Sequence, residues 1–283
     1  MIRIGITDNR GHLSCDLLVK WIELHGAEPL FIPISLDSEV GRLALQLART
    51  ESLLKRCSGV VLSGNDLYIP QIFYGEDWHS ETKKTKERDK QDVRFDTELY
   101  ISKFVLKQKL PFIAVCEGMH VFNVAMGGSL IQHIPDTIQN KTSKIMHDDP
   151  DFQEKSKILA QNLHDSFEKI KTNPTGIGIF KQPHSMRVLP KTGLAELYLE
   201  SNPKNNLGKI FELSLHQQGC FKQNLSAELV PVALSPDQII EAAEVVGYPT
   251  FNLLVQSNIE CNLGGIASIA IKKLIEAAEK IAH

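Results

Sequence analysis

Short apolar runs alternate with longer amphipathic stretches through the first half of the chain, and this alternation constrains the fold more than any other feature. The apolar runs have the length and composition of buried strands. They are Ile2–Thr7, Pro29–Ile34, Gly59–Leu62 and Leu110–Val115. The stretches with helical periodicity are Leu13–His25, Ser38–Arg56, Val93–Lys107 and the segment from Cys116 through Asn123 and Met126. Strands and helices in this order build a parallel sheet covered by helices on both faces. We therefore expect an α/β fold.

The second half of the chain is organised differently. Strand-like segments follow one another at Met186–Leu189, Gly208–Leu215, Glu228–Leu234, Ile239–Val246 and Phe251–Gln256, and a closing helix is expected at Ala267–Ile281. Residues 136–183, by contrast, are polar and of mixed charge, with a possible helix only between Glu154 and Lys171, and we expect a variable, lid-like insertion there. Because no repeat or linker divides the chain, residues 1–283 are expected to form a single domain.

Composition and charge exclude several kinds of partner. The 283 residues are 42% hydrophobic and 23% charged, as in ordinary globular proteins, and the formal net charge is -3. A charge so close to zero gives no general attraction to nucleic acid or to a membrane surface. No apolar stretch approaches the roughly 20 residues that span a bilayer, and the N-terminus has no targeting pattern. We expect a soluble, cytoplasmic protein that binds small molecules.

The cysteines do not suggest a disulfide framework or a metal site. Their spacings contain no close pair, so the simplest interpretation is five free thiols. They are Cys15, Cys57, Cys116, Cys220 and Cys261. The acidic and basic residues show no metal-ligand clustering, and no glycine-rich phosphate loop follows the first strand. No metal and no cofactor are therefore expected.

One cysteine lies where a buried strand passes into a helix. In the segment Ala114-Val115-Cys116-Glu117-Gly118, a small residue stands two positions before the thiol and a glycine two positions after it. Such a nucleophile elbow exposes the sulfur, the helix N-terminus favours the thiolate, and the next backbone N–H can point at a developing oxyanion. Taken alone, this segment fits a buried structural thiol better. The surrounding motifs reverse that interpretation.

Three segments resemble the γ-glutamyl hydrolase branch (peptidase C26) of the class I glutamine amidotransferases, and in particular the γ-glutamyl-γ-aminobutyrate hydrolases. They are Pro111–Leu130, Ser214–Gly219 and Ser235–Ala242, in an order and spacing that also match the family. The first ends in Asn-Val-Ala-Met-Gly-Gly-Ser-Leu, a long signature that is hard to obtain by chance. The resemblance covers most of the chain. It implies a flavodoxin-like, three-layer αβα fold whose central sheet is mostly parallel, with added antiparallel strands.

The resemblance also implies a reaction. In the family, a cysteine attacks the γ-carbonyl of a glutamyl amide, the amine leaves, and water hydrolyses the thioester; a histidine moves the proton and a glutamate orients the imidazole. The family motif Val-Gln-Trp-His-Pro-Glu corresponds here to residues 255–260, Val-Gln-Ser-Asn-Ile-Glu, so Glu260 is kept and Asn258 occupies the histidine position. An amide cannot accept a proton near neutral pH. We therefore expect weak or altered turnover through Cys116.

Two further positions depart from the family. Glu117 follows the nucleophile where relatives often have arginine or leucine, and a carboxylate there disfavours the thiolate. Ser63-Gly64-Asn65 stands where relatives commonly have Pro-Gly-Gly or Pro-Gly-Ser, a turn whose backbone N–H resembles a second oxyanion donor. Gly64 matches this pattern. With Asn65 in this turn, it stays open whether the backbone N–H serves as the second oxyanion donor. Asparagine tolerates left-handed dihedrals better than most residues, so the turn itself can persist.

Other histidines offer substitutes for the missing base. His120 follows Cys116 by four residues on the same predicted helix face, where relatives often have glutamine; it is a candidate base, a substrate contact or a packing residue. His216, with Gln217 beside it, matches a histidine that the family keeps near the pocket. His184 stands at a position that many relatives share. Both of these histidines are expected to contact substrate or to be structural.

Three functions are consistent with these features. The first is hydrolysis of γ-glutamyl amides through Cys116 with the triad histidine missing. The second is a catalytically degenerate member of the family that binds a small molecule or a protein. The third, which matches the C-terminal segments less well, is a glutaminase subunit that feeds ammonia to a synthase. A small γ-glutamyl compound is the expected ligand, and a homodimer remains open beside a monomer.

Overall fold

The computed structural model describes residues 1–34, 40–65, 68–75, 93–134, 184–214, 216–261 and 266–282. The strands are β1 (Arg3–Thr7), β2 (Glu28–Ile32), β3 (Gly59–Leu62), β4 (Phe112–Val115), β5 (His184–Val188), β6 (Ile210–Glu212), β7 (Leu229–Leu234), β8 (Ile240–Val245) and β9 (Asn252–Val255). The helices are α1 (Leu13–Leu24), α2 (Val40–Leu54), α4 (Val93–Gln108), α5 (Glu117–Ala125), α9 (Gly193–Ser201) and α10 (Ile266–Ile281). Short 3₁₀ helices lie at Gln71–Phe73, Lys222–Asn224 and Ile259–Cys261.

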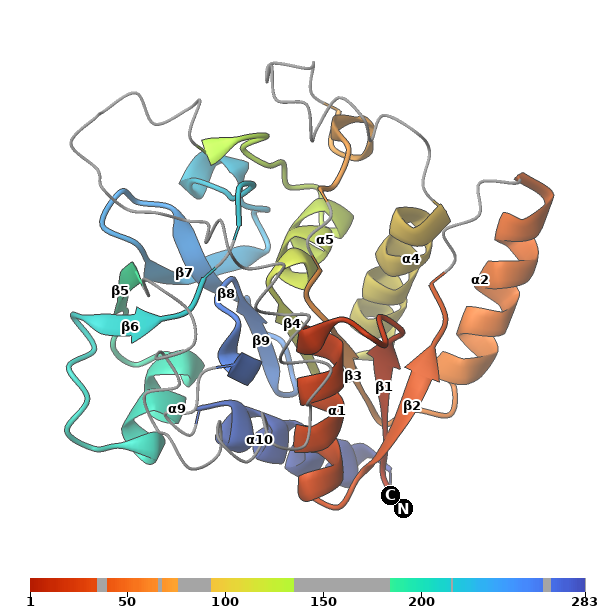
Figure 1. Cartoon of the computed structure of the whole chain (residues 1–283), viewed down its shortest axis with the longest axis horizontal. Coiled ribbons are helices and arrows are strands. Elements are labelled where there is room, and N and C mark those ends of the chain that lie inside the picture. The colour runs from red at the N-terminus through yellow and green to blue at the C-terminus, as the bar shows by residue number, and fades with distance from the viewer. Residues whose placement is uncertain are drawn as a thin grey trace.

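Within the described ranges the strands form one nine-stranded sheet in the order β2-β1-β3-β4-β9-β8-β7-β5-β6 (Figure 1). The five strands from β2 to β9 pair in parallel, and β9 lies directly beside β4, with Val115 opposite Val255. Antiparallel pairings then add β8, β7, β5 and β6. The expected α/β class and the added antiparallel strands are confirmed.

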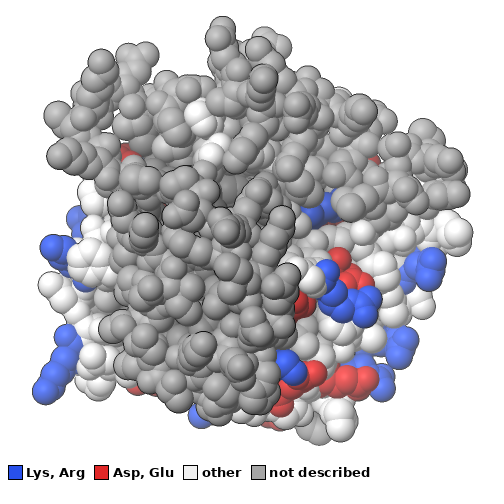
Figure 2. All heavy atoms as spheres, viewed as in Figure 1, with Lys and Arg blue, Asp and Glu red and all other residues white. Residues whose placement is uncertain are grey.

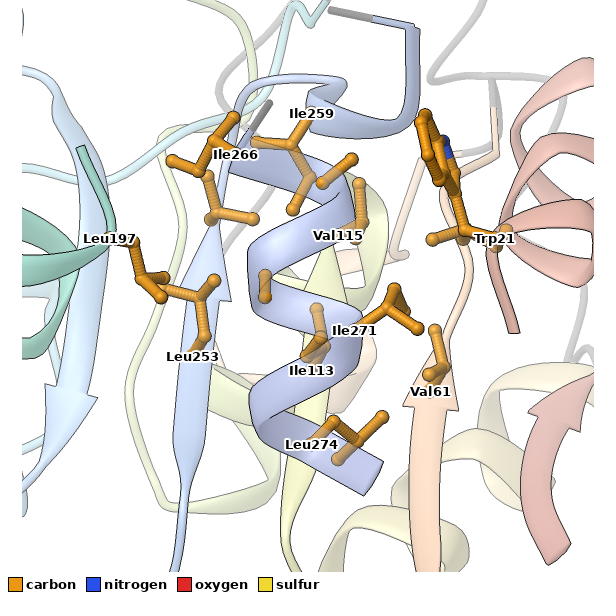
Figure 3. Close-up of a cluster of buried hydrophobic side chains, with 14 of the residues drawn as sticks. Trp21, Val61, Ile113, Val115, Leu197, Leu253, Ile259, Ile266, Ile271 and Leu274 are labelled. Carbon is orange, nitrogen blue, oxygen red and sulfur yellow. The ribbon is translucent and has the colours of Figure 1, made fainter. Parts of the chain in front are cut away.

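Helices cover both faces of the sheet, because its parallel strands are apolar on both sides. Buried side chains of α1, α9 and α10, such as Leu17, Leu197 and Ile271, form one core with strand residues that include Ile113. Figure 3 shows part of this core, with α10 running along the strands and Trp21 beside its upper end. A second core joins α2, α4 and α5 to the opposite face. The expected three-layer arrangement is therefore confirmed.

Helix α9 lies where no helix is expected from the sequence, between two strand-like segments. Its start does carry a signal: the Thr192 side chain accepts a hydrogen bond from the Ala195 N–H at 3.2 Å, as N-cap residues do. The helix has only 9 residues, and unlike α5, which is equally short, it lies in no segment that resembles a family motif. The strand expected at Gly208–Leu215 is likewise shorter, since only Ile210–Glu212 pairs with β5.

Several expectations lie outside the described residues. These include the insertion at 136–183 and the helix expected between Glu154 and Lys171. The lid and the single-domain organisation therefore stay predictions. In the part of the chain that the structure describes, no helix is long and apolar enough to cross a membrane. Figure 2 shows both signs of charge side by side on the described part of one face.

Gly118 allows α5 to approach β3 closely. A Cβ atom at this position would lie 2.8 Å from the Leu62 carbonyl oxygen and 2.9 Å from the Leu62 Cβ. Both distances are shorter than van der Waals contact permits. Because Leu62 ends a fully buried strand, its backbone cannot move away easily. The glycine after the elbow thus sets the distance between helix and sheet.

We expect Gly118→Ala to lower the free energy of unfolding by about 1–3 kcal/mol, because the added methyl group overpacks the contact with Leu62. Urea unfolding followed by circular dichroism measures the change. Gly208→Ala is the control, since a Cβ there would approach only the Asn206 side chain, at 3.2 Å, and we expect a change of less than about 0.5 kcal/mol. Equal effects of the two substitutions would contradict this account.

Candidate functional site

The candidate site lies at the carboxyl edge of the parallel strands. Leu62 pairs with Ala114 and Val115 pairs with Val255, so β3, β4 and β9 end side by side. In open α/β sheets, the crevice outside these strand ends is where ligands bind. The residues that follow the strands are Gly64 after β3, Cys116 after β4, and Gln256, Asn258 and Glu260 after β9. The topology therefore brings together the segments singled out in the sequence.

Cys116 occupies a sharp turn between β4 and α5. Its backbone adopts φ 54° and ψ −114°, a conformation that is strained for any residue with a side chain. Its N–H donates to the Val255 carbonyl oxygen at 2.7 Å, which ties the turn to β9. The Glu117 backbone forms a hydrogen bond with the Cys116 side chain. The backbone geometry is that of a nucleophile elbow, but the Cys116 side chain is buried, contrary to the expectation that the turn exposes the sulfur.

Gly64 touches Cys116 from the neighbouring strand end. A Cβ atom at Gly64 would lie 3.0 Å from the Cys116 Cβ and 3.6 Å from the Asn258 Nδ2. The Gly64 N–H donates to Ser14 Oγ at 3.2 Å. In this arrangement the Gly64 N–H points toward α1. Its role as an oxyanion donor therefore stays a prediction. The Asn65 side chain turns elsewhere and donates to Asn9 Oδ1 at 3.2 Å.

Asn258 and Glu260 are in direct contact. Asn258 Nδ2 donates to Glu260 Oε1 at 3.0 Å, and both side chains are buried. Burial raises the pKa of Glu260, while hydrogen bonds from Asn258 and Ser14 oppose that rise. The Asn258 N–H also donates to the Leu213 carbonyl oxygen at 2.8 Å, which fixes the loop. The carboxylate thus still faces the side chain at position 258.

His120 lies near Gln256, which contacts Cys116. Gln256 Nε2 donates to Cys116 Sγ at 3.7 Å, whereas Gln256 Oε1 and His120 Nε2 are buried with no hydrogen-bond partner among the described residues. Burial lowers the pKa of His120 to about 4, although Gln256 and the charge of Glu241 act in the opposite direction. His120 is therefore a neutral imidazole near pH 7.

His216 lies beside His120, and Gln217 follows it in the chain. The two imidazole rings are 6.4 Å apart between centroids. His216 Nδ1 is 2.6 Å from the Gln218 carbonyl oxygen, and since a carbonyl only accepts, this nitrogen carries a proton. His216 Nε2 lies 3.8 Å from Glu241 Oε1. Gln217 accepts a hydrogen bond from the Tyr68 hydroxyl. His184 begins β5.

The electrostatics of the site disfavour a resting thiolate. Burial first, and then the charges of Glu260 and Glu117, raise the pKa of Cys116 above its ordinary value of 9.0. Because burial also lowers the pKa of His120 to about 4, transfer of the thiol proton to this imidazole is unfavourable. The resting pair is thus a neutral thiol and a neutral imidazole.

Glu117 has a partner that the sequence did not reveal. Its carboxylate accepts from Arg94 Nη2 at 2.6 Å, in the interior of the protein. Ser14 and Glu241 are two further buried polar residues that the sequence analysis did not single out. Arg94 and Glu98 stand four apart on a predicted helix, which is a weak signal for an ion pair; nothing comparable marks Ser14 or Glu241. Among the described residues, no three His, Cys, Asp or Glu side chains form a candidate metal site.

Comparison with known proteins agrees with this geometry. A family model described as Peptidase C26 matches residues 11–259. The chain belongs to the peptidase C26 family. This C26 protein is 26% identical over 261 residues to a glutamine amidotransferase-like protein of Rickettsia prowazekii, covering 90% of this chain and 85% of that one. It is 24% identical over 258 residues to the γ-glutamyl-γ-aminobutyrate hydrolase of Escherichia coli strain K12, covering 89% and 82%.

The fold of the C26 protein is that of the glutamine amidotransferases. Its structure is similar to the glutaminase domain of Trypanosoma brucei CTPS with bound acivicin, with a TM-score of 0.53 and 13% sequence identity. The superposition covers 99% of this chain and 94% of that domain. The expected fold is confirmed.

The state of His120 predicts an acid-sensitive stability. Because the pKa of His120 falls from 6.5 in the unfolded chain to about 4 in the native protein, the unfolded chain binds a proton that the native protein lacks between these pH values. The contribution of His120 is complete above pH 6.5 and is lost as the pH falls toward 4, by up to about 3 kcal/mol.

Urea unfolding at several pH values between 7.5 and about 4.5 measures this loss. We expect His120→Gln to lose less stability than the unchanged protein over this range, because glutamine binds no proton in either state. All other titrating groups are shared by the two proteins and cancel in the comparison. The same pH dependence in both proteins would contradict the buried neutral imidazole.

Proposed function

We propose that this C26 protein hydrolyses γ-glutamyl amides slowly, with Cys116 as the nucleophile. The observation that carries the proposal is the strained turn at Cys116, held against the ends of β3 and β9 by Gly64 and by the Val255 carbonyl oxygen. A thiol in this conformation is presented to a carbonyl carbon, and the first amide of α5 supports the developing oxyanion. The sequence relationship to the E. coli hydrolase supports the γ-glutamyl class.

The reaction has two steps. Cys116 attacks the γ-carbonyl, a carbon–sulfur bond forms, and the thiol proton must reach the leaving amine. Water then attacks the thioester, which releases glutamate and restores the thiol. Asn258 cannot carry the proton in either step. The thiol proton passes instead to the leaving amine of the substrate as the carbon–nitrogen bond breaks, and the rate is expected to be about 10⁴ to 10⁶ below that of a complete triad.

Incubation with γ-glutamyl-γ-aminobutyrate, other γ-glutamyl amines and glutamine tests the proposal. Glutamate release is measured enzymatically, and a glutamyl adduct on Cys116 by mass spectrometry of the intact protein. Cys116→Ala should abolish both signals, because it removes the sulfur atom on which the thioester forms. Cys220→Ala is the control, since this other buried cysteine lies in the core near β8. Release that survives Cys116→Ala would refute the proposal.

A second candidate is a catalytically degenerate protein that binds a γ-glutamyl compound without hydrolysing it. The hydrogen bond between Asn258 and Glu260 favours it, because the carboxylate that would orient an imidazole instead holds an amide. The neutral thiol and the low pKa of His120 also favour a site that binds without hydrolysing. Under this alternative, calorimetry detects binding of the amide where no glutamate is released.

Asn258→His discriminates between the two candidates. Because Glu260 Oε1 already lies 3.0 Å from the side chain at position 258, an imidazole there finds its orienting carboxylate in place. We expect glutamate release to rise on the order of 10²-fold to 10⁴-fold. Asn258→Ala is the control and should give no gain. Wild-type turnover as fast as that of Asn258→His would exclude a degenerate site.

A further inference from the structure

The Gln256 side chain contacts the Cys116 sulfur from the end of β9. Gln256 Nε2 donates to Cys116 Sγ at 3.7 Å, a distance within the range of hydrogen bonds to sulfur. The preceding residue also binds the elbow, because the Val255 carbonyl oxygen accepts from the Cys116 N–H at 2.7 Å. Two successive residues therefore hold Cys116, one at its backbone and one at the atom that reacts.

The backbone of Gln256 fixes the place of this amide. Its N–H donates to the carbonyl oxygen of Glu241 on β8 at 2.8 Å. Its side chain is enclosed by the protein, with an exposed fraction of 0%. Because the backbone is hydrogen-bonded and the side chain is enclosed, the donor already faces the sulfur before any reaction begins. Stabilisation by preorganised dipoles requires this arrangement.

Stability alone does not account for a glutamine at this position. Gln256 Oε1 is buried, and among the residues that the structure describes it has no hydrogen-bond partner. An unpaired buried acceptor is destabilising, and an apolar side chain of similar volume would avoid that effect. The preceding residues Leu254 and Val255 are such apolar core residues. What the glutamine adds is its hydrogen bond to the sulfur.

The sulfur gains negative charge in both steps of the proposed reaction. In the first step, its proton passes to the leaving amine while the carbon–sulfur bond forms. In the second, water attacks the thioester carbon, the carbon–sulfur bond breaks, and its electron pair goes to the sulfur until a proton from that water returns to it. A hydrogen bond to a charged acceptor is roughly twice as strong as one to a neutral acceptor. An N–H at the sulfur therefore stabilises these states more than it stabilises the resting thiol.

A neutral donor also suits the surroundings of the sulfur. Asn258 cannot form a cation there, and its Nδ2 is directed at Glu260 Oε1 at 3.0 Å. The structure directs two uncharged donors at the sulfur instead, Gln256 Nε2 and the Glu117 backbone. In a buried site, such dipoles act more strongly than they would in water.

We propose that Gln256 is a catalytic residue of this site: its side-chain N–H stabilises the negative charge on the Cys116 sulfur while the thioester forms and while it breaks. The inference rests on the proposed function of Cys116 as the nucleophile. It assigns to an uncharged amide part of the stabilisation that an imidazolium supplies in a complete triad.

Alkylation of Cys116 by iodoacetamide tests the proposal without any substrate, because this reagent also reacts with the thiolate. The rate is measured at about pH 8, with the Cys116 peptide followed by mass spectrometry. Gln256→Met keeps a similar volume and removes the N–H donor. We expect the rate to fall about 10-fold to 100-fold, as the loss of one hydrogen bond to a charged group implies.

Looser packing would have the opposite effect. A substitution that opens the protein exposes the thiol and raises the rate of alkylation, whereas loss of the donor lowers it. Cys261, which is 5% exposed, serves as the internal reference for opening in every sample. Gln218→Met is the matched control: this glutamine is also buried, but its side chain bonds to the Ile69 backbone, and we expect no fall in the rate at Cys116.

Gln256→Leu provides a second measurement if Gln256→Met fails to fold, which urea unfolding reveals. Leucine differs from methionine in shape but also lacks the N–H, so the same fall is expected. An unchanged or higher rate of Cys116 alkylation in either folded variant, relative to Cys261, would overturn the proposal. An equal fall in Gln218→Met would overturn it as well.

The two proposals can fail separately. If alkylation falls as expected but Cys116→Ala leaves glutamate release intact, only the proposed function fails. If Cys116→Ala abolishes release while Gln256→Met leaves alkylation unchanged, the function stands and the role of Gln256 fails. Where both hold, Gln256→Met should lower kcat about 10-fold to 100-fold and leave KM within about twofold, because the donor meets the sulfur rather than the bound amide.

Discussion

The pairing of β9 with β4 is the interaction on which the rest of the site depends. β9 comes from near the end of the chain, yet it lies parallel to β4, and the Cys116 N–H bonds to the Val255 carbonyl oxygen at 2.7 Å. A parallel pair needs a long crossover connection, and here much of the chain lies between the two strands. This register places the residues after β9 beside the Cys116 thiol, namely Gln256, Asn258 and Glu260.

The same burial that assembles the site also sets its chemistry. Removing the thiol from water raises the pKa of Cys116, and three nearby carboxylates add to this effect. A protonated imidazole at position 258 would offset those charges, but asparagine carries none. Under the proposed function, the site combines the elbow of a nucleophile with an asparagine at the position where a triad has its base.

The sequence predicted the fold, and it singled out the segments that the structure brings together at the strand ends, because both depend on patterns along the chain. Alternating apolar runs gave the α/β class, and the unbroken motif at residues 255–260 gave the positions of Asn258 and Glu260. Contacts between distant segments were not predictable in this way: neither the Gly64 bond to Ser14 nor the Arg94 ion pair follows from periodicity. The short helix α9 was missed because, unlike the equally short α5, it lies in no segment that resembles a family motif.

The backbone conformation of Cys116 also determines which residue type is least strained at this position. At φ 54° and ψ −114°, any side chain costs on the order of 1–3 kcal/mol, whereas glycine adopts such angles with little strain. A single substitution to glycine would therefore relieve the backbone strain and erase the thiol at the same time, although it would also remove a buried side chain from the core. The cysteine occupies a position whose backbone conformation favours glycine.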